Sequence, residues 1–282
     1  MTPEQRYVFD TTGYVHLKNA LGEEELQRAQ EAADRYMHTP PEDLPDGFYR
    51  IPETNPPFDK YRWAFAFDRA LEHLTMHPVT WPIIKELTAN KPCLVGAGNL
   101  AVNTHEHPAS GLHGGGTGHM KVLGVNRNGL HGPSGFGDPG TVYADFFNVF
   151  WYLSDVQPGD GGLIVVLGSH KSEFESPFET LHESEDSLPQ GIVNITPNAG
   201  DVIIMPEFVT HGALKWQPRD RERRFLHLHF APHFHTMRRD ALCRDMDEAT
   251  KARLTPETQE LIEIAWNTHE KEISKRDIIR LI

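Results

Sequence analysis

Between residues 93 and 235 the chain is a succession of short apolar runs, and this stretch most strongly limits what it can fold into. The runs are separated by Gly, Pro and Asn, which are residues that form turns. Among the runs are CLVGAGNLAVN, VYADFFNVFWYLSDV, GLIVVLGS, DVIIMP and FLHLHFAP. Strands at this close spacing predict an antiparallel sandwich or barrel and argue against alternating βαβ units.

Helical patterns lie on both sides of this β-rich region. Residues 23–37 begin with three glutamates, which suit the positive end of a helix, and carry apolar side chains at helical spacing, namely Leu26, Ala29, Ala33 and Tyr36. A second helical pattern covers residues 67–88 and is interrupted by Pro78. We therefore predict an α+β fold in a single domain over 1–282, with helices packed on the β core. Its parts are a helical segment 1–92, a β core 93–235 and a C-terminal helical extension 236–282.

Composition excludes several classes of partner. The net charge of −13 argues against nucleic acid or an anionic membrane, because both attract basic patches. No stretch approaches the roughly 18–20 apolar residues that cross a bilayer, and the N-terminus has no apolar run typical of a signal peptide. Two cysteines, Cys93 and Cys243, are too few for a disulfide framework. We expect a cytoplasmic protein that acts on a small molecule, and the sequence does not indicate its oligomeric state.

Two histidine-containing segments and one arginine stand at positions typical of a non-heme iron site. GLHGGG contains His113, and MPEFVTHGA, which follows an apolar strand, contains His211. Arg223 opens the alternating run RRFLHLHF 12 residues after that second histidine (223 − 211 = 12). Non-heme iron oxygenases hold the metal with two histidines and one carboxylate on one face of the ion. Arginine suits bidentate binding of a carboxylate.

Three segments carry a resemblance to a known family. NVFWYLSDVQPGDGGLIVVLGSHK, FDTTGYVHLKNALGEEELQRA and HPVTWPIIKELT resemble, in order and spacing, the phytanoyl-CoA dioxygenase family of Fe(II)- and 2-oxoglutarate-dependent oxygenases. The resemblance covers roughly residues 5–235, and the two histidines are separated by 98 residues (211 − 113 = 98), similar to the family.

The resemblance implies a fold, cofactors and site residues. The implied fold is a double-stranded β-helix core, of the jelly-roll or cupin-like kind, with flanking helices. The implied iron ligands are His113 and His211. Arg223 matches the arginine that pairs with the far carboxylate of 2-oxoglutarate, and Trp151 matches a tryptophan near this cosubstrate. His170, in GSHK, matches a residue that is usually structural, and Ala213 replaces a small hydroxyl residue that often assists at the site.

Gly115 is the departure that matters, because the family carries its Asp ligand at this position, two residues after the first histidine. Three interpretations follow. In the first, chloride takes the vacated position and the enzyme is a radical halogenase. In the second, a carboxylate from elsewhere, Asp145 or Glu207, completes an ordinary site. In the third, the chain is a non-catalytic small-molecule binder. We expect the second, with hydroxylation or a related oxidation of an unactivated C–H bond by O₂.

Other polar residues are candidates for substrate contacts. Tyr143 and Asp145 share one face of their predicted strand by period-two alternation, so they are candidates to fix a polar substrate, although core packing explains them equally well. The Pro-rich segment 38–66 is either a surface excursion or a cover for the site.

Overall fold

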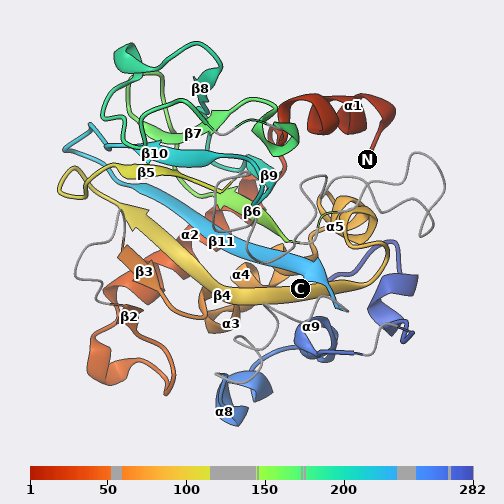
Figure 1. Ribbon diagram of the computed structural model, residues 1–282. Helices are drawn as coiled ribbons and strands as arrows, with labels where there is room; N and C mark the ends of the chain where they lie inside the picture. Colours follow the sequence, from red (N-terminus) through yellow and green to blue (C-terminus); the bar gives the residue numbers. More distant parts are fainter. Residues whose placement is uncertain are drawn as a thin grey trace.

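The computed structural model describes residues 1–51, 59–114, 144, 146–172, 174, 176–233, 246–265 and 268–281. These residues form a mixed fold of helices and antiparallel sheets (Figure 1). The predicted α+β class is confirmed at this level. Within the described residues, no helix is both long and apolar enough to cross a membrane.

The strands form two sheets in which every pairing is antiparallel. The larger sheet has seven strands in the order β1 (Val15–Leu17), β9 (Val202–Pro206), β6 (Phe147–Tyr152), β11 (Arg223–Pro232), β4 (Pro92–Asn103), β3 (Asp59–Tyr61) and β2 (Arg50–Ile51). The smaller sheet has four strands in the order β5 (Ser110–His113), β10 (His211–Leu214), β7 (Gly162–Val166) and β8 (Ile192–Asn194).

The helices lie mainly at the two ends of the chain. The α-helices are α1 (Pro3–Thr12), α2 (Glu23–His38), α3 (Ala64–Phe67), α4 (Arg69–His73), α5 (Trp81–Leu87), α8 (Glu248–Ala252) and α9 (Pro256–Ile262). Short 3₁₀ turns are η1 (Pro41–Asp43), η2 (Leu74–Met76), η3 (Ser169–Lys171), η4 (Glu185–Ser187) and η5 (Glu272–Lys275). The helix predicted over 23–37 is therefore present as α2, and the pattern over 67–88 is divided among α4, η2 and α5.

The central strand β6 shows how the larger sheet separates two cores. All six of its residues are buried, so both faces of the strand are covered. Val149 and Trp151 join a core with residues of helices α2, α4 and α5. Phe150 and Tyr152, on the opposite face, join a second core with Leu163 of the smaller sheet. The larger sheet is therefore covered by helices on one face and by the smaller sheet on the other, which encloses the space between the two sheets.

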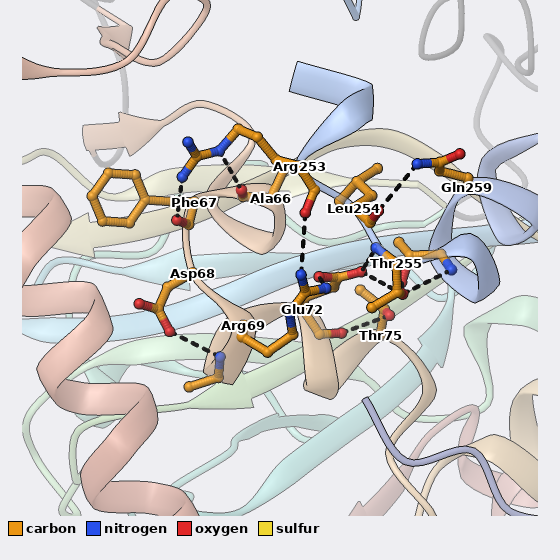
Figure 2. Close-up of polar contacts among 12 residues, drawn as sticks. Ala66, Phe67, Asp68, Arg69, Glu72, Thr75, Arg253, Leu254, Thr255 and Gln259 are labelled. Atoms are coloured by element: carbon orange, nitrogen blue, oxygen red, sulfur yellow. Dashed lines mark hydrogen bonds and ion pairs between the residues drawn. The ribbon is translucent and has the colours of Figure 1, made fainter. Parts of the chain in front are cut away.

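The C-terminal extension is fastened to the helical layer around the buried side chain of Glu72 (Figure 2). The Glu72 carboxylate accepts hydrogen bonds from the backbone N–H and the hydroxyl of Thr255, both at 2.7 Å, and forms an ion pair with Arg69. Arg253 donates to the carbonyl oxygens of Ala66 and Phe67 at 3.2 and 2.9 Å. These polar contacts join segments that are about 180 residues apart in the sequence.

We expect Glu72→Ala to lower the free energy of unfolding by about 1–3 kcal/mol, because it removes the buried carboxylate that accepts both hydrogen bonds from Thr255. Urea denaturation monitored by circular dichroism measures this change. Glu248→Ala is the control, since it removes an exposed ion pair with Lys251 and should change the free energy by no more than about 0.5 kcal/mol. Equal stability of the two variants would show that the contacts of Glu72 contribute little.

Candidate metal centre

Strand pairing brings the two predicted metal-binding histidines side by side. β5 and β10 are neighbours in the smaller sheet, and their register places His211 directly opposite His113. The centroids of the two imidazole rings are 4.2 Å apart. Residues 98 positions apart in the sequence (211 − 113 = 98) therefore meet at one place.

Both imidazoles have a defined tautomer. Nδ1 of His113 lies 2.8 Å from the carbonyl oxygen of Gly111, and Nδ1 of His211 lies 2.7 Å from that of Val209. A carbonyl oxygen only accepts hydrogen bonds, so each Nδ1 carries the proton and donates it. Each Nε2 therefore retains a lone pair, as a metal ligand requires.

Glu207 supplies a carboxylate beside this histidine pair. It directly follows β9 and precedes β10 by four residues (211 − 207 = 4). One ligand atom from each of His113, Glu207 and His211 lies within 4.8 Å of the other two. Of the two acids considered from the sequence, Glu207 therefore reaches the pair, whereas Asp145 lies outside the described residues, as does Gly115.

The charges of the cluster suit a divalent cation. Burial raises the pKa of Glu207, but His211, His229 and a hydrogen bond from Asn148 outweigh it, so that the pKa lies below its ordinary value. Burial lowers the pKa of His211, which favours the neutral imidazole. Two neutral nitrogens and one anionic oxygen form the donor set that binds ferrous iron in non-heme oxygenases.

Gly114 allows the two halves of this cluster to approach one another. Its φ is +78°, and a Cβ at this position would lie 2.4 Å from the carbonyl oxygen of Glu207 and 2.8 Å from that of Val209. Any side chain here would push the end of β5 away from the turn that carries Glu207. The sequence motif HGGG contained this signal, although the sequence alone did not show which backbone the glycine would contact.

Arg223 lies in the same cavity as the histidine pair and is 3% exposed. Its Nε and Nη2 donate to Oδ1 of Asn103 at 3.0 and 2.7 Å. Its Nη1 is buried and has no hydrogen-bond partner in the described part of the chain. A buried guanidinium nitrogen without a partner is costly, so this atom indicates the position of an anionic ligand group.

Gly162, the last glycine of the sequence GDGG, provides the space for this guanidinium. Its φ is +85°, and a Cβ would lie 2.4 Å from Nη1 of Arg223. Gly162 lies in one of the segments that resemble the phytanoyl-CoA dioxygenase family, but the sequence does not show its contact with Arg223. The contact places the smaller sheet, through β7, directly against the arginine of the larger sheet.

If Arg223 holds a carboxylate cosubstrate, we expect Gly162→Ala to raise the KM for that cosubstrate roughly 10- to 100-fold, because the methyl group displaces the guanidinium. Gly159→Ala is a matched control: its φ is +87°, but a Cβ there meets nothing within 4 Å. Both variants carry similar backbone strain, so only a difference in KM between them reports on the contact with Arg223. Equal KM values would contradict this role of Gly162.

Trp151 is not brought to the site. It lies on the helical face of the larger sheet, where its Nε1–H donates to the carbonyl oxygen of Leu74 at 3.1 Å and its ring packs on His77 at 5.1 Å. Its strand neighbours Phe150 and Tyr152 line the cavity instead. We therefore correct the prediction that Trp151 lies beside the cosubstrate. Side chains alternate between the two faces of β6, and that of Trp151 is on the face covered by helices.

Of the remaining sequence candidates, Tyr143 and Asp145, the predicted substrate contacts, lie outside the described residues. Ala213 lines the cavity and pairs across the sheet with Ser110, whose side chain also lines it. His170 is buried, and its Nε2–H donates to the carbonyl oxygen of Asp10 at 3.1 Å, which fits the structural role expected of it.

A second cluster of ligand-type side chains, Glu25, His73 and His77, lies on the helical side of the larger sheet. Nδ1 of His77 accepts the backbone N–H of Val79 at 3.3 Å. The proton of His77 is therefore on Nε2, which donates to Glu25 at 3.3 Å. The other carboxylate oxygen of Glu25 accepts the backbone N–H of Gly22 at the start of α2. This tautomer directs an N–H and not a lone pair at the cluster, so the contacts serve packing and helix capping.

Comparisons with known proteins agree with the fold. No protein-family model matches the sequence, and no curated protein matches it either. Among solved structures, HygX from Streptomyces hygroscopicus is 22% identical, with a TM-score of 0.65 over 83% of this chain and 88% of HygX. That structure contains nickel, 2-oxoglutarate and hygromycin B. HygX has also been solved with iron bound. SnoK, a non-heme alpha ketoglutarate dependent carbocyclase from nogalamycin biosynthesis, is 19% identical, with a TM-score of 0.57 over 83% of this chain and 85% of SnoK. EctD from S. alaskensis is 18% identical, with a TM-score of 0.60 over 83% of this chain and 78% of EctD. At these identities the similarity shows a shared fold.

Proposed function

We propose that this protein is an Fe(II)- and 2-oxoglutarate-dependent oxidoreductase that oxidises an unactivated C–H bond of a small molecule. The observation that carries the proposal is the convergence of His113, Glu207 and His211 at one point, beside a cavity that the two histidines line together with Arg223. The similar fold of HygX supports it, since one HygX structure contains nickel with 2-oxoglutarate and another contains iron. We further propose that the two sheets form a double-stranded β-helix of the phytanoyl-CoA dioxygenase type.

Each residue of the site has a distinct role in this proposal. His113 and His211 present Nε2 lone pairs, and Glu207 adds the negative charge that balances a ferrous ion. Arg223 would bind the carboxylate of 2-oxoglutarate that does not contact the metal, because its Nη1 has no other partner among the described residues. Bound iron, with 2-oxoglutarate and O₂, supplies the oxidising chemistry, in which the cosubstrate leaves as succinate and CO₂.

The protein contributes positioning and a partly apolar enclosure. Phe150, Leu163 and Phe225 line the cavity between the metal ligands and Arg223, and each is buried. Apolar walls lower the local dielectric and so strengthen the electrostatic contacts inside the cavity. The chain would thereby hold 2-oxoglutarate at two ends, by charge at Arg223 and through a metal ion at the histidine pair.

Glu207 favours oxidation over halogenation. A halogenase needs the third ligand position to be free of protein carboxylates so that chloride binds there. Here the side chain of Glu207 lies within 4.8 Å of both histidines, although Gly115 stands where the family carries Asp. Hydroxylation is one outcome of such a centre, and SnoK, which has a similar fold, is a carbocyclase.

Anaerobic titration tests the proposal. Fe(II) with 2-oxoglutarate should give a weak charge-transfer band at roughly 500 nm, and admission of O₂ should produce succinate. Absence of both the band and succinate would favour a small-molecule binder of the same fold that does not turn over. A band that shifts when chloride is added would favour the halogenase.

A further inference from the structure

Asn148 links the carboxylate of Glu207 to a second histidine of the cavity. It lies on β6, is 1% exposed, and faces the space between the sheets. Its Nδ2 donates to Oε2 of Glu207 at 2.8 Å. Its Oδ1 lies 2.9 Å from Nε2 of His227, which lines the cavity from β11. The three side chains thus form a chain across neighbouring strands of the larger sheet.

The orientation of the Asn148 amide is determined by these two partners. A carboxylate accepts hydrogen bonds, so the NH₂ group of the amide must face Glu207. The carbonyl oxygen then faces His227, whose Nε2 must carry a proton to donate. Packing restrains this imidazole, with ring centroids 4.5 Å from Phe150 and 4.1 Å from His229. The donor and acceptor directions agree along the whole chain.

We propose that Asn148 is a positioning residue that holds Glu207 in the orientation needed for metal binding, and that His227 fixes the amide of Asn148. The proposal rests on the proposed function only in that Glu207 is a metal ligand. The hydrogen bond occupies Oε2, whereas Oε1 has no hydrogen bond within the described residues. One restrained oxygen fixes the plane of the carboxylate, because rotation about the Cγ–Cδ bond of Glu207 would break the hydrogen bond to Asn148.

The location of Glu207 explains why such a support is needed. The residue is at the end of β9 and at the start of a turn, so its strand does not restrain the side chain. The long glutamate side chain also has more rotatable bonds than aspartate, and each must be ordered before the metal binds. A buried amide fixed by a neighbouring histidine provides this order before the metal arrives.

Metal affinity measured with Co(II) in the absence of 2-oxoglutarate tests the first half of the proposal. We expect Asn148→Ala to raise the dissociation constant roughly 10- to 100-fold. Val149→Ala is a matched control on the same strand, because Val149 is fully buried on the opposite, helical face. That variant should lower the melting temperature without changing Co(II) affinity. A dissociation constant for Asn148→Ala within twofold of the unmodified protein would overturn the proposal.

Two substitutions of His227 test the second half and leave Asn148 in place. The amide of glutamine reaches the position of Nε2, so His227→Gln should retain the donor to Asn148 and keep Co(II) affinity within about threefold. The amide of asparagine reaches only the position of Nδ1, so His227→Asn should weaken binding roughly 10-fold. Equal affinities for these two variants would contradict a role of His227 in fixing Asn148, even if Asn148→Ala does not fold.

The same titration separates this proposal from the proposed function. If the unmodified protein does not bind Co(II), or if His113→Ala binds it equally well, the metal centre itself is wrong. If the unmodified protein binds and His113→Ala does not, the Asn148 and His227 variants report on positioning alone. Loss of binding in His227→Gln as complete as in His113→Ala would make His227 a ligand and overturn its positioning role.

Discussion

Replacement of Glu207 by alanine is expected to weaken Fe(II) binding at least about 100-fold and to abolish succinate formation, because it removes the only anionic ligand found near the histidine pair in the described residues. Glu207→Asp should retain weak binding, since the shorter side chain keeps the charge but does not reach the same position. Isothermal titration with Fe(II) under anaerobic conditions measures both effects.

Glu257→Ala is the control for this experiment. Glu257, on α9, forms an ion pair with Arg276 and does not line the cavity. The Glu257→Ala variant should bind Fe(II) with the same affinity as the unmodified protein. Glu207 would not be a ligand if Glu207→Ala bound Fe(II) with the affinity of the unmodified protein and if chloride had the same effect on the charge-transfer bands of the two proteins. The third position would then be filled by another group.

Replacement of Arg223 by methionine is expected to raise the KM for 2-oxoglutarate by a factor of roughly 30 to 5,000. This factor corresponds to about 2–5 kcal/mol for loss of one partner of a buried charge pair. Methionine keeps much of the apolar bulk of the side chain, so the change is mainly electrostatic. Affinity for Fe(II) in the absence of 2-oxoglutarate should change little, because Arg223 is not a metal ligand.

Arg224 provides a matched control one residue along the same strand. Its side chain points to the helical face of the larger sheet, where it forms an ion pair with Asp34. Arg224→Met should therefore leave the KM for 2-oxoglutarate unchanged. An equal rise in KM for both variants would indicate a general effect on β11 and would contradict specific binding of the cosubstrate by Arg223.

Part of the site followed from local sequence patterns. His113 and His211 stood next to glycine-rich turns in β-rich segments, and the spacing of the second histidine and Arg223 was typical of a metal site with a carboxylate cosubstrate. Strand register, which the sequence does not specify, then placed the two histidines opposite one another. The helix at 23–38 was also predictable, because its glutamates and buried alanines follow a clear helical pattern.

The sequence alone does not single out the carboxylate of Glu207, because this residue is distant from the position at which the motif carries its acid. Motif spacing directs attention to Gly115, two residues after the first histidine, whereas Glu207 precedes the second histidine by four residues (211 − 207 = 4). Its proximity to His113 depends on the close approach that Gly114 permits. Such contacts between distant segments have no local sequence pattern.

The placement of Trp151 failed for a different physical reason. Every residue of β6 is buried, so the strand lacks the alternation of polar and apolar residues that reveals its two faces. The sequence therefore did not show whether Trp151 or its neighbours Phe150 and Tyr152 face the cavity. Only the packing of helices on one side and the smaller sheet on the other determines this choice.

A crystal structure of the protein grown anaerobically with Fe(II) and 2-oxoglutarate, with anomalous data at the iron edge, tests the metal centre most directly. We predict one strong anomalous peak at roughly 2.0–2.3 Å from Nε2 of His113, Nε2 of His211 and a carboxylate oxygen of Glu207, with 2-oxoglutarate reaching Arg223. Two results would contradict the assignment of Glu207 as the third iron ligand. One is an iron bound by the two histidines with chloride in the third position and Glu207 turned away. The other is the absence of an anomalous peak between these side chains.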